Sequence, residues 1–203
     1  IPYSFVSIPG YTFIRNDRTT GIGGGVGVYI RESTPFSRRV DLEQESVESI
    51  WIEILLPNTA PFIIITTYRP PDSSNHLPEH YEYHLDTCLK KIDFEKKETI
   101  IIGDINCDYL KAKDHLDLKN VFSMYGYKQL IDSTTRITEN SKTLIDVIQT
   151  NKSNNISSSA VFPSSLSDHD LIGCVRKLYN IKYQSKTIKC CNYANYNSDN
   201  INN

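Results

Sequence analysis

Three short polar side chains stand at alternate positions just after a run of β-branched residues. Asp104, Asn106 and Asp108 follow Gly103 at the end of a Thr-Ile-Ile-Ile run. Such a run is typical of a strand that is buried on both faces, and alternate positions of an extended segment point the same way. A carboxylate and an amide on one face could grip a phosphate or polarise a water near a metal. The other interpretation is an ordinary Asx-type turn after a strand.

Three further segments also join an apolar strand to side chains that can do chemistry. They are residues 62–67 leading into Tyr68, the apolar run 144–148 with Asp146 inside it, and Ser167-Asp168-His169 before the apolar run 171–175. Polar groups gathered from the ends of several strands are typical of a site built on a rigid sheet. Asp146 needs a partner, because burying an unpaired carboxylate in an apolar strand is costly.

Length and charge limit the classes of protein that this chain can belong to. Its 203 residues, 39% hydrophobic and 23% charged, describe one globular domain. Residues 1–175 carry 17 Lys and Arg against 23 Asp and Glu, whereas residues 176–203 carry five against one. An acidic body does not attract nucleic acid through its overall field. Any such contact would therefore depend on local Lys or Arg side chains or on a bound cation.

Several other patterns favour ordinary structural roles. The five cysteines lack C-x-x-C spacing, which indicates free thiols in a reducing, intracellular compartment. No apolar run is long enough to span a membrane, so no membrane partner is expected. His80 and His84 stand four apart on a predicted helix but lack a third ligand, which favours a solvated face. The glycines at 23–25 precede a strand rather than a helix, which favours a tight turn over a phosphate cradle.

The elements that would position these residues are mostly strands. Periodicity and turn residues predict helices at 78–92 and 114–124, a loop at 151–159, and strands at 11–14, 26–30, 49–55, 62–67, 99–102, 127–131, 144–149, 160–162 and 170–178. Strands interleaved with only two helices indicate an α+β sandwich with the helices outside the sheets. Residues 179–203 are basic and Asn-rich without periodicity, as in a linker or tail.

Short motifs in a fixed order resemble a known superfamily. They are Gly23-Gly-Gly-Val26, Tyr68-Arg-Pro-Pro71, Gly103-Asp-Ile-Asn106, Thr135-Arg136 with Thr143-Leu-Ile-Asp146, and Ser167-Asp-His169. In this order they resemble the endonuclease/exonuclease/phosphatase superfamily. More narrowly, they look like the apurinic-type endonuclease domain of non-LTR (LINE-type, jockey-like) retrotransposons. The resemblance implies a domain over residues 1–178 with a DNase I-like fold, a four-layer α/β/β/α sandwich of two packed β-sheets flanked by helices.

The same resemblance implies an activity and its partners. A divalent cation, Mg²⁺ or Mn²⁺, would help a water to hydrolyse a DNA phosphodiester. The product would carry a 3′-hydroxyl that primes a reverse transcriptase domain further along the parent polyprotein. The expected partners are therefore DNA and that reverse transcriptase domain, and the expected place of action is the nucleus.

The resemblance also implies a role for each matched residue. Asp104 would orient or deprotonate the water, and Asp168 would join the metal shell. Asn106 would bind the phosphate region, and Tyr68 would donate to a phosphate oxygen. His169 would contact the scissile phosphate, and Asp146 would orient His169. Cations and hydrogen-bond donors of this kind stabilise the negative charge that develops during phosphodiester hydrolysis. Arg136 has two open interpretations, a contact to the DNA backbone or an ion pair that braces a loop.

One departure from the superfamily pattern concerns the metal. Members carry an Asn and then a Glu, the principal metal ligand, on their first two strands, and this chain starts at Ile1, after both positions. Its first acidic residue is Asp17, in the turn before the glycines. The chain is therefore expected to be an N-terminally truncated fragment that lacks the first strands and is weakly active or inactive. Two alternatives keep the fold. One is a phosphoesterase acting on a small phosphoester or phosphoinositide, and the other is a non-catalytic remnant or binding module.

Overall fold

A six-stranded mixed sheet forms the centre of the molecule. The computed structural model describes residues 2–19 and 23–178, so Ile1 and the predicted tail at 179–203 lie outside the described residues. The strands follow the order β3 (Phe36–Arg38), β4 (Glu48–Ile54), β5 (Phe62–Tyr68), β6 (Glu98–Asp104), β10 (Asp146–Thr150) and β7 (Lys128–Gln129). Neighbouring strands are antiparallel except β5 and β6, which are parallel. The strands predicted at 49–55 and 62–67 are thereby confirmed, and they pair as an antiparallel hairpin.

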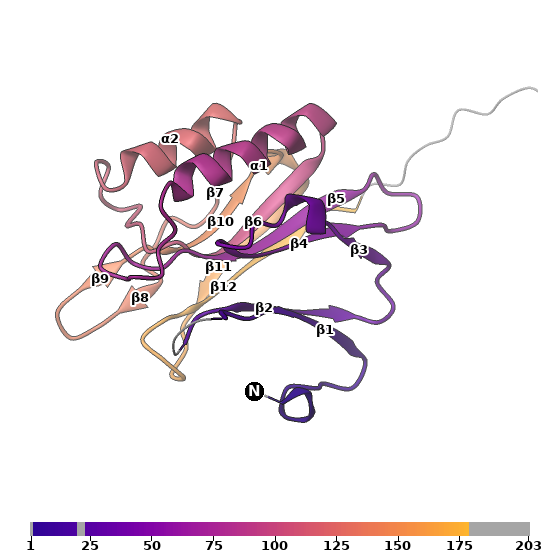
Figure 1. Cartoon of the computed structure of the whole chain (residues 1–203), viewed down its shortest axis with the longest axis horizontal. Helices are drawn as coiled ribbons and strands as arrows, with labels where there is room; N and C mark the ends of the chain where they lie inside the picture. The colour runs from indigo at the N-terminus through magenta and orange to yellow at the C-terminus, as the bar shows by residue number, and fades with distance from the viewer. Residues whose placement is uncertain (1, 20–22, 179–203) are drawn as a thin grey trace, which may run out of the picture.

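Helices cover one face of this sheet and hairpins cover the other (Figure 1). The helices are α1 (Tyr81–Glu95) and α2 (Leu116–Met124). The hairpins are β1 (Tyr11–Asn16) with β2 (Val26–Arg31), and β11 (Ile156–Phe162) with β12 (Leu171–Arg176). A small hairpin of β8 (Arg136–Ile137) and β9 (Lys142–Thr143) and three 3₁₀ turns at Tyr3–Phe5, Val40–Leu42 and Ser153–Asn155 complete the described elements. The expected arrangement, β layers packed together with helices outside, is confirmed.

The alternation of apolar residues explains these layers. On β4, Ile50, Ile52 and Ile54 pack with Ile30 of the β1–β2 hairpin, whereas Trp51 belongs to the core that includes α1. Helix α1 is also what joins β5 to β6, because two parallel neighbours need a crossover connection. The carboxyl-terminal ends of β5 and β6 therefore lie at the same edge of the sheet.

Two predicted elements differ most from the structure. The loop expected at 151–159 ends early, because β11 already begins at Ile156. Its serines resemble loop composition, yet Ser157 and Ser158 are exposed on a hairpin, where polar residues are tolerated. The strand expected at 127–131 shortens to β7, a two-residue edge strand beside β10.

Two further observations concern the cysteines and the helices. Cys88, Cys107 and Cys174 are free thiols, whereas Cys190 and Cys191 lie outside the described residues. In the part of the chain that the structure describes, no helix has the length and apolar character needed to cross a membrane.

Gly103 allows β5 and β6 to approach each other next to the candidate site. A Cβ built at this position would stand 1.8 Å from the carbonyl oxygen of Thr67, which is backbone and cannot move aside easily. We therefore expect Gly103→Ala to lower the free energy of unfolding by about 3 kcal/mol, measured by urea denaturation. The control is Gly173→Ala on β12, where the nearest atom is an exposed ring carbon of Phe162 at 3.2 Å. Equal losses in the two variants would contradict this account of Gly103.

Candidate active site

The strand registers place four chemically capable side chains in one row. Glu48 pairs with Tyr68, Tyr68 with Asp104, and Asp104 with Asp146, across β4, β5, β6 and β10. Directly paired residues on neighbouring strands present their side chains on the same face. Phe62 lies on the same face of β5 as Tyr68, because an even number of positions separates them. Phe62 packs with Ile30 of β2, so this face is the one that the β1–β2 and β11–β12 hairpins cover. A phenol and three carboxylates therefore share one edge of the central sheet.

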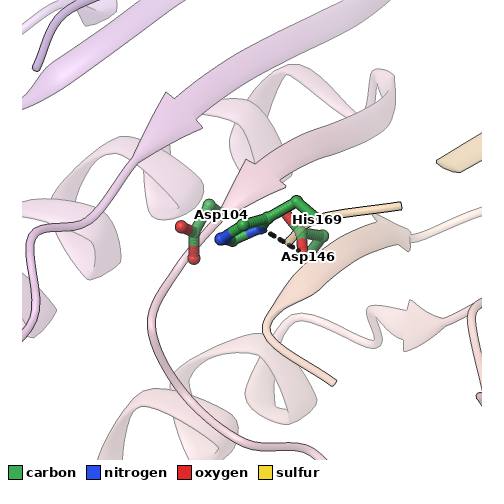
Figure 2. A group of neighbouring side chains, drawn as sticks. All are labelled: Asp104, Asp146 and His169. Carbon is green, nitrogen blue, oxygen red and sulfur yellow. Dashed lines mark hydrogen bonds and ion pairs between the residues drawn. The ribbon is translucent and has the colours of Figure 1, made fainter. Parts of the chain in front are cut away.

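His169 completes the group from the loop that precedes β12. Its Nδ1 lies 3.0 Å from Oδ2 and 3.2 Å from Oδ1 of Asp146. Figure 2 shows the imidazole between the two aspartates, with its other nitrogen toward Asp104. The expected contact between His169 and Asp146 is therefore present. A carboxylate at Nδ1 favours the tautomer with a proton on that nitrogen and leaves Nε2 to face Asp104.

Backbone contacts hold the His169 loop against β8. The amide of Ile137 donates to the carbonyl oxygen of Asp168 at 2.9 Å, and the amide of Asp170 donates to the carbonyl oxygen of Thr135 at 2.7 Å. A bridge also pairs Arg136 with His169. Within the loop, the hydroxyl of Ser167 accepts from the amide of His169 at 3.0 Å. The backbone of His169 is thus held on both sides, which limits where its imidazole can lie.

Asn106 is turned inward by its own backbone. It has φ of 46°, and its amide N–H donates to Oδ1 of Asp104 at 2.9 Å. Its side-chain Nδ2 donates to the carbonyl oxygen of Arg69 at 2.9 Å. Asparagine adopts this left-handed conformation more readily than most residues. Asn106 therefore links the end of β6 to the segment after β5, and the phosphate contact expected of it stays a prediction.

Two of the residues considered from the sequence take other positions. Asp108 is buried away from the row, where Oδ1 accepts from the amides of Leu110 and Leu144, both at 3.1 Å. Asp168 accepts from Nε of Arg136 at 2.7 Å and is not in the group formed by Asp104, Asp146 and His169. Of the two interpretations of Arg136, the ion pair is thus present. The metal role of Asp168 and a DNA contact by Arg136 stay predictions.

The two metal ligands that the superfamily pattern places upstream of Ile1 are not represented among the described residues. Ile1 itself lies outside them, since the description begins at Pro2. Asp17, the first acidic residue of the chain, forms an ion pair with Arg15 and is not in the group around Asp104. That the Asn and Glu of the pattern lie before Ile1, and that the chain is weakly active without them, stay predictions.

Two supporting residues had no role assigned from the sequence. Thr135 is fully buried, and its hydroxyl accepts from the amides of Ile145 and Asp146 at 3.2 and 3.0 Å. Arg69 is also buried, and its amide donates to the carbonyl oxygen of Asp104 at 2.9 Å. Both lie within the matched motifs, but their contacts join separate segments. The motifs point to Thr135 and Arg69 as positions of interest, but they do not predict the hydrogen bonds that these residues make.

The environment of Asp104 raises the pKa of its carboxyl to about 6. Burial is the main cause, because desolvation disfavours the charged form, and the neighbouring Asp146 carboxylate adds to it. The amide of Asn106 and the positive charges of His169 and Arg136 act in the opposite direction. By contrast, the hydrogen bond from Arg136 lowers the pKa of the exposed Asp168. Asp104 is therefore suited to accept a proton near neutral pH.

The donor atoms of this group fit a divalent cation. Asp104, Asp146 and His169 each offer one ligand atom, and these atoms lie within 4.8 Å of one another. It is the one such group of three or more His, Cys, Asp and Glu residues in the described ranges 2–19 and 23–178. His80 and His84 are not part of it. Carboxylate oxygens suit Mg²⁺ and Mn²⁺, and an imidazole nitrogen is more favourable for Mn²⁺.

These positions allow a hydrolytic reaction at a phosphate ester. Asp104 can take a proton from a water that attacks phosphorus, while the imidazole, in the form that carries protons on both nitrogens, can donate from Nε2 to a phosphate oxygen. The Tyr68 hydroxyl is a further donor at the same edge. A bound cation would neutralise negative charge on the phosphate. The site therefore has a base, donors and a cation position on one rigid sheet.

Comparison with solved structures identifies the fold. No protein-family model and no curated protein sequence matches the chain. Solved structures do match, including an endonuclease/exonuclease/phosphatase family protein from Leptotrichia buccalis with a TM-score of 0.60 and 16% identity, over 86% of this chain and 75% of that one. The chain therefore has a DNase I-like fold, which it shares with this structure.

Particular members of the superfamily resemble the chain in the same way. The endonuclease domain of TRAS1, a telomere-specific non-LTR retrotransposon, matches with a TM-score of 0.65 and 15% identity, over 84% of this chain and 80% of that one. A 3′–5′ exonuclease from Neisseria meningitidis matches with a TM-score of 0.59 and 12% identity, over 83% and 80%. At such identities the likeness concerns the fold, and the resemblance to retrotransposon endonucleases is supported at that level.

The raised pKa of Asp104 predicts how stability depends on pH. The folded protein binds a proton at Asp104 more tightly than the unfolded chain, so this carboxyl favours folding below about pH 4 and loses that effect as pH rises through about 6. We expect Asp104→Asn to raise the free energy of unfolding at pH 8 by about 1–3 kcal/mol and to flatten its fall between pH 4 and 6. Denaturant unfolding across this pH range measures both effects.

The matched control for this prediction is Asp132→Asn, on an exposed loop between β7 and β8. It should leave the slope unchanged. A lower free energy of unfolding at pH 8 in Asp104→Asn would show that the ionised Asp104 carboxylate does not destabilise the folded protein.

Proposed function

We propose that this chain is a metal-dependent DNA endonuclease domain of a retrotransposon. The observation that carries the proposal is the meeting of Asp104, Asp146 and His169, from β6, β10 and the β12 loop, beside Tyr68. A base, a carboxylate-held imidazole and a phenol at one edge suit attack on a phosphodiester. The choice of DNA and of a retrotransposon rests on the ordered motifs, and the fold shared with the TRAS1 endonuclease domain supports it.

In this proposal, hydrolysis leaves a 3′-hydroxyl from which a reverse transcriptase extends. Tyr68 and His169 contact the phosphate, Asn106 holds the adjoining backbone in place, and Asp104 accepts the proton of the attacking water. Asp146 acts through His169 by fixing its orientation. The partners are DNA and the reverse transcriptase domain of the parent polyprotein, the cation is Mg²⁺ or Mn²⁺, and the place of action is the nucleus.

Metal binding can be tested without any substrate. We expect the chain to bind Mn²⁺ and the variants Asp104→Ala and Asp146→Ala to bind it at least about tenfold more weakly, measured as free Mn²⁺ by electron paramagnetic resonance. Asp132→Ala is the control and should bind like the parent chain. Asp168→Ala decides whether Asp168 joins the metal shell, because a residue that serves only Arg136 leaves the affinity unchanged. Equal Mn²⁺ binding by all variants would argue against a cation at this site.

Activity is tested by relaxation of supercoiled plasmid. We expect weak nicking with Mg²⁺ or Mn²⁺, none with EDTA, and a further loss of at least about 100-fold in Asp104→Ala and His169→Ala. Asp132→Ala should nick like the parent chain. A DNA polymerase should extend the nicks directly, since extension needs a 3′-hydroxyl. Nicks that require phosphatase treatment before extension would contradict the proposed product.

A second candidate function is hydrolysis of a small phosphoester. The acidic body favours it, because 23 Asp and Glu against 17 Lys and Arg in residues 1–175 give little general attraction for DNA. Release of phosphate from inositol phosphates or sugar phosphates by the parent chain, without plasmid nicking, would support this candidate. A chain that binds DNA but hydrolyses neither substrate would support a non-catalytic binding module of the same fold.

A further inference from the structure

An ion pair between the turn after β1 and the start of β4 lies near the ring of Tyr68. Nε of Arg18 donates to Oε1 of Glu48 at 2.7 Å, and Nη2 donates to the same oxygen. Both side chains are only 12% exposed. The guanidinium carbon of Arg18 lies 5.9 Å from the centre of the Tyr68 ring. A cation at this distance from an aromatic ring is attracted to it.

The glycine turn before β2 is built around this ion pair. The amide of Gly25 donates to Oε2 of Glu48. At Gly24 a Cβ would stand 2.2 Å from Cζ of Arg18, whereas at Gly23 it would meet nothing within 4 Å. The two glycines have nearly the same backbone angle, φ of 82° and 79°. Gly24 therefore leaves room for the guanidinium, and this requirement is separate from the conformational freedom that the turn needs.

The hydroxyl of Tyr68 is the group that could contact a ligand. Within residues 2–19 and 23–178 its hydroxyl has no hydrogen-bond partner, which leaves that hydroxyl available to a ligand. Its neighbours in the row are Glu48 on one side and Asp104 on the other. Partly buried ion pairs add little net stability, because desolvation offsets their attraction, but they can fix one arrangement of their surroundings. The Arg18–Glu48 pair lies beside Tyr68, so the arrangement that it would fix is that of the Tyr68 ring.

We infer that Arg18, Glu48, Gly24 and Gly25 form a positioning device for the Tyr68 phenol, here called the Arg18 clamp. Glu48 and the Gly25 amide hold the guanidinium, and the guanidinium holds the ring so that its hydroxyl faces the phosphate of a substrate beside Asp104. The inference rests on the proposed function for the identity of that substrate. The arrangement of the ring can be tested without it.

Two alanine variants separate the clamp from the general effect of altering a glycine turn. Gly24→Ala adds a Cβ against the guanidinium, which is the far end of a flexible side chain and will be displaced, whereas Gly23→Ala adds the same strain with no contact. The probe is the ring signal of Tyr68 in ¹H–¹³C spectra of the chain with labelled tyrosine, assigned by Tyr68→Phe. We expect Gly24→Ala and Arg18→Gln to move this signal and Gly23→Ala to leave it in place.

Hydrolysis provides a second measurement. In the chain with Tyr68, Arg18→Gln and Gly24→Ala should lower kcat for plasmid nicking about tenfold, while in the Tyr68→Phe background the same changes should lower it less than about twofold. Gly23→Ala should retain parent activity.

Each outcome supports or overturns the inference. An unmoved Tyr68 signal in Gly24→Ala and Arg18→Gln overturns it, as does an equal shift in Gly23→Ala or an equal loss of kcat in both backgrounds. If no variant hydrolyses any substrate, the proposed function fails, and the Tyr68 signal still decides whether the clamp exists.

Discussion

The parallel pairing of β5 with β6 is the constraint on which the candidate site depends. Because both strands run the same way, Tyr68 and Asp104 finish at the same edge of the sheet and face the same layer. The antiparallel β10 begins where β6 ends. Asp146, the first residue of β10, is therefore paired with Asp104 and belongs to the row. Gly103 permits the close approach of β6 to Thr67 just before the row is reached. A crossover connection is required by the same constraint, and helix α1 lies in it.

Charge at this edge is balanced by segments from other parts of the chain. Asp104 and Asp146 are adjacent carboxylates, and their mutual repulsion together with burial disfavours two negative charges. His169 lies between them (Figure 2), Arg136 is near, and a divalent cation fits the same atoms. At the other end of the row, Glu48 is neutralised by Arg18 and by the Gly25 amide. Each acid in the row therefore has a positively charged neighbour or a hydrogen-bond donor. Because these partners come from separate segments, the arrangement exists only in the folded protein.

Sequence reasoning located most of the residues in this edge but few of the contacts between them. Asp104, Asp146, Tyr68 and His169 stood out because each follows, interrupts or precedes an apolar run, and their meeting at one edge was the expected consequence. The supports were not visible in the same way. Thr135 lies 11 residues from Asp146, and Arg18 lies 30 residues from Glu48. No local periodicity connects such pairs, because only the packing of separate strands brings them together. Composition likewise misassigned the serine-rich start of β11, where hairpin pairing outweighs loop-like residues.

The sequence by itself determined the strands, the two helices, the apolar faces and the order of the polar strand ends. Those features follow from alternation, helical spacing and turn residues, which act over a few neighbouring positions. The tertiary structure decided the register of β4, β5, β6 and β10, and with it the row from Glu48 to Asp146. It also decided that Asp168 pairs with Arg136 while His169 faces Asp146. Register is set by which apolar faces are buried against other layers, and that information is spread over the whole chain.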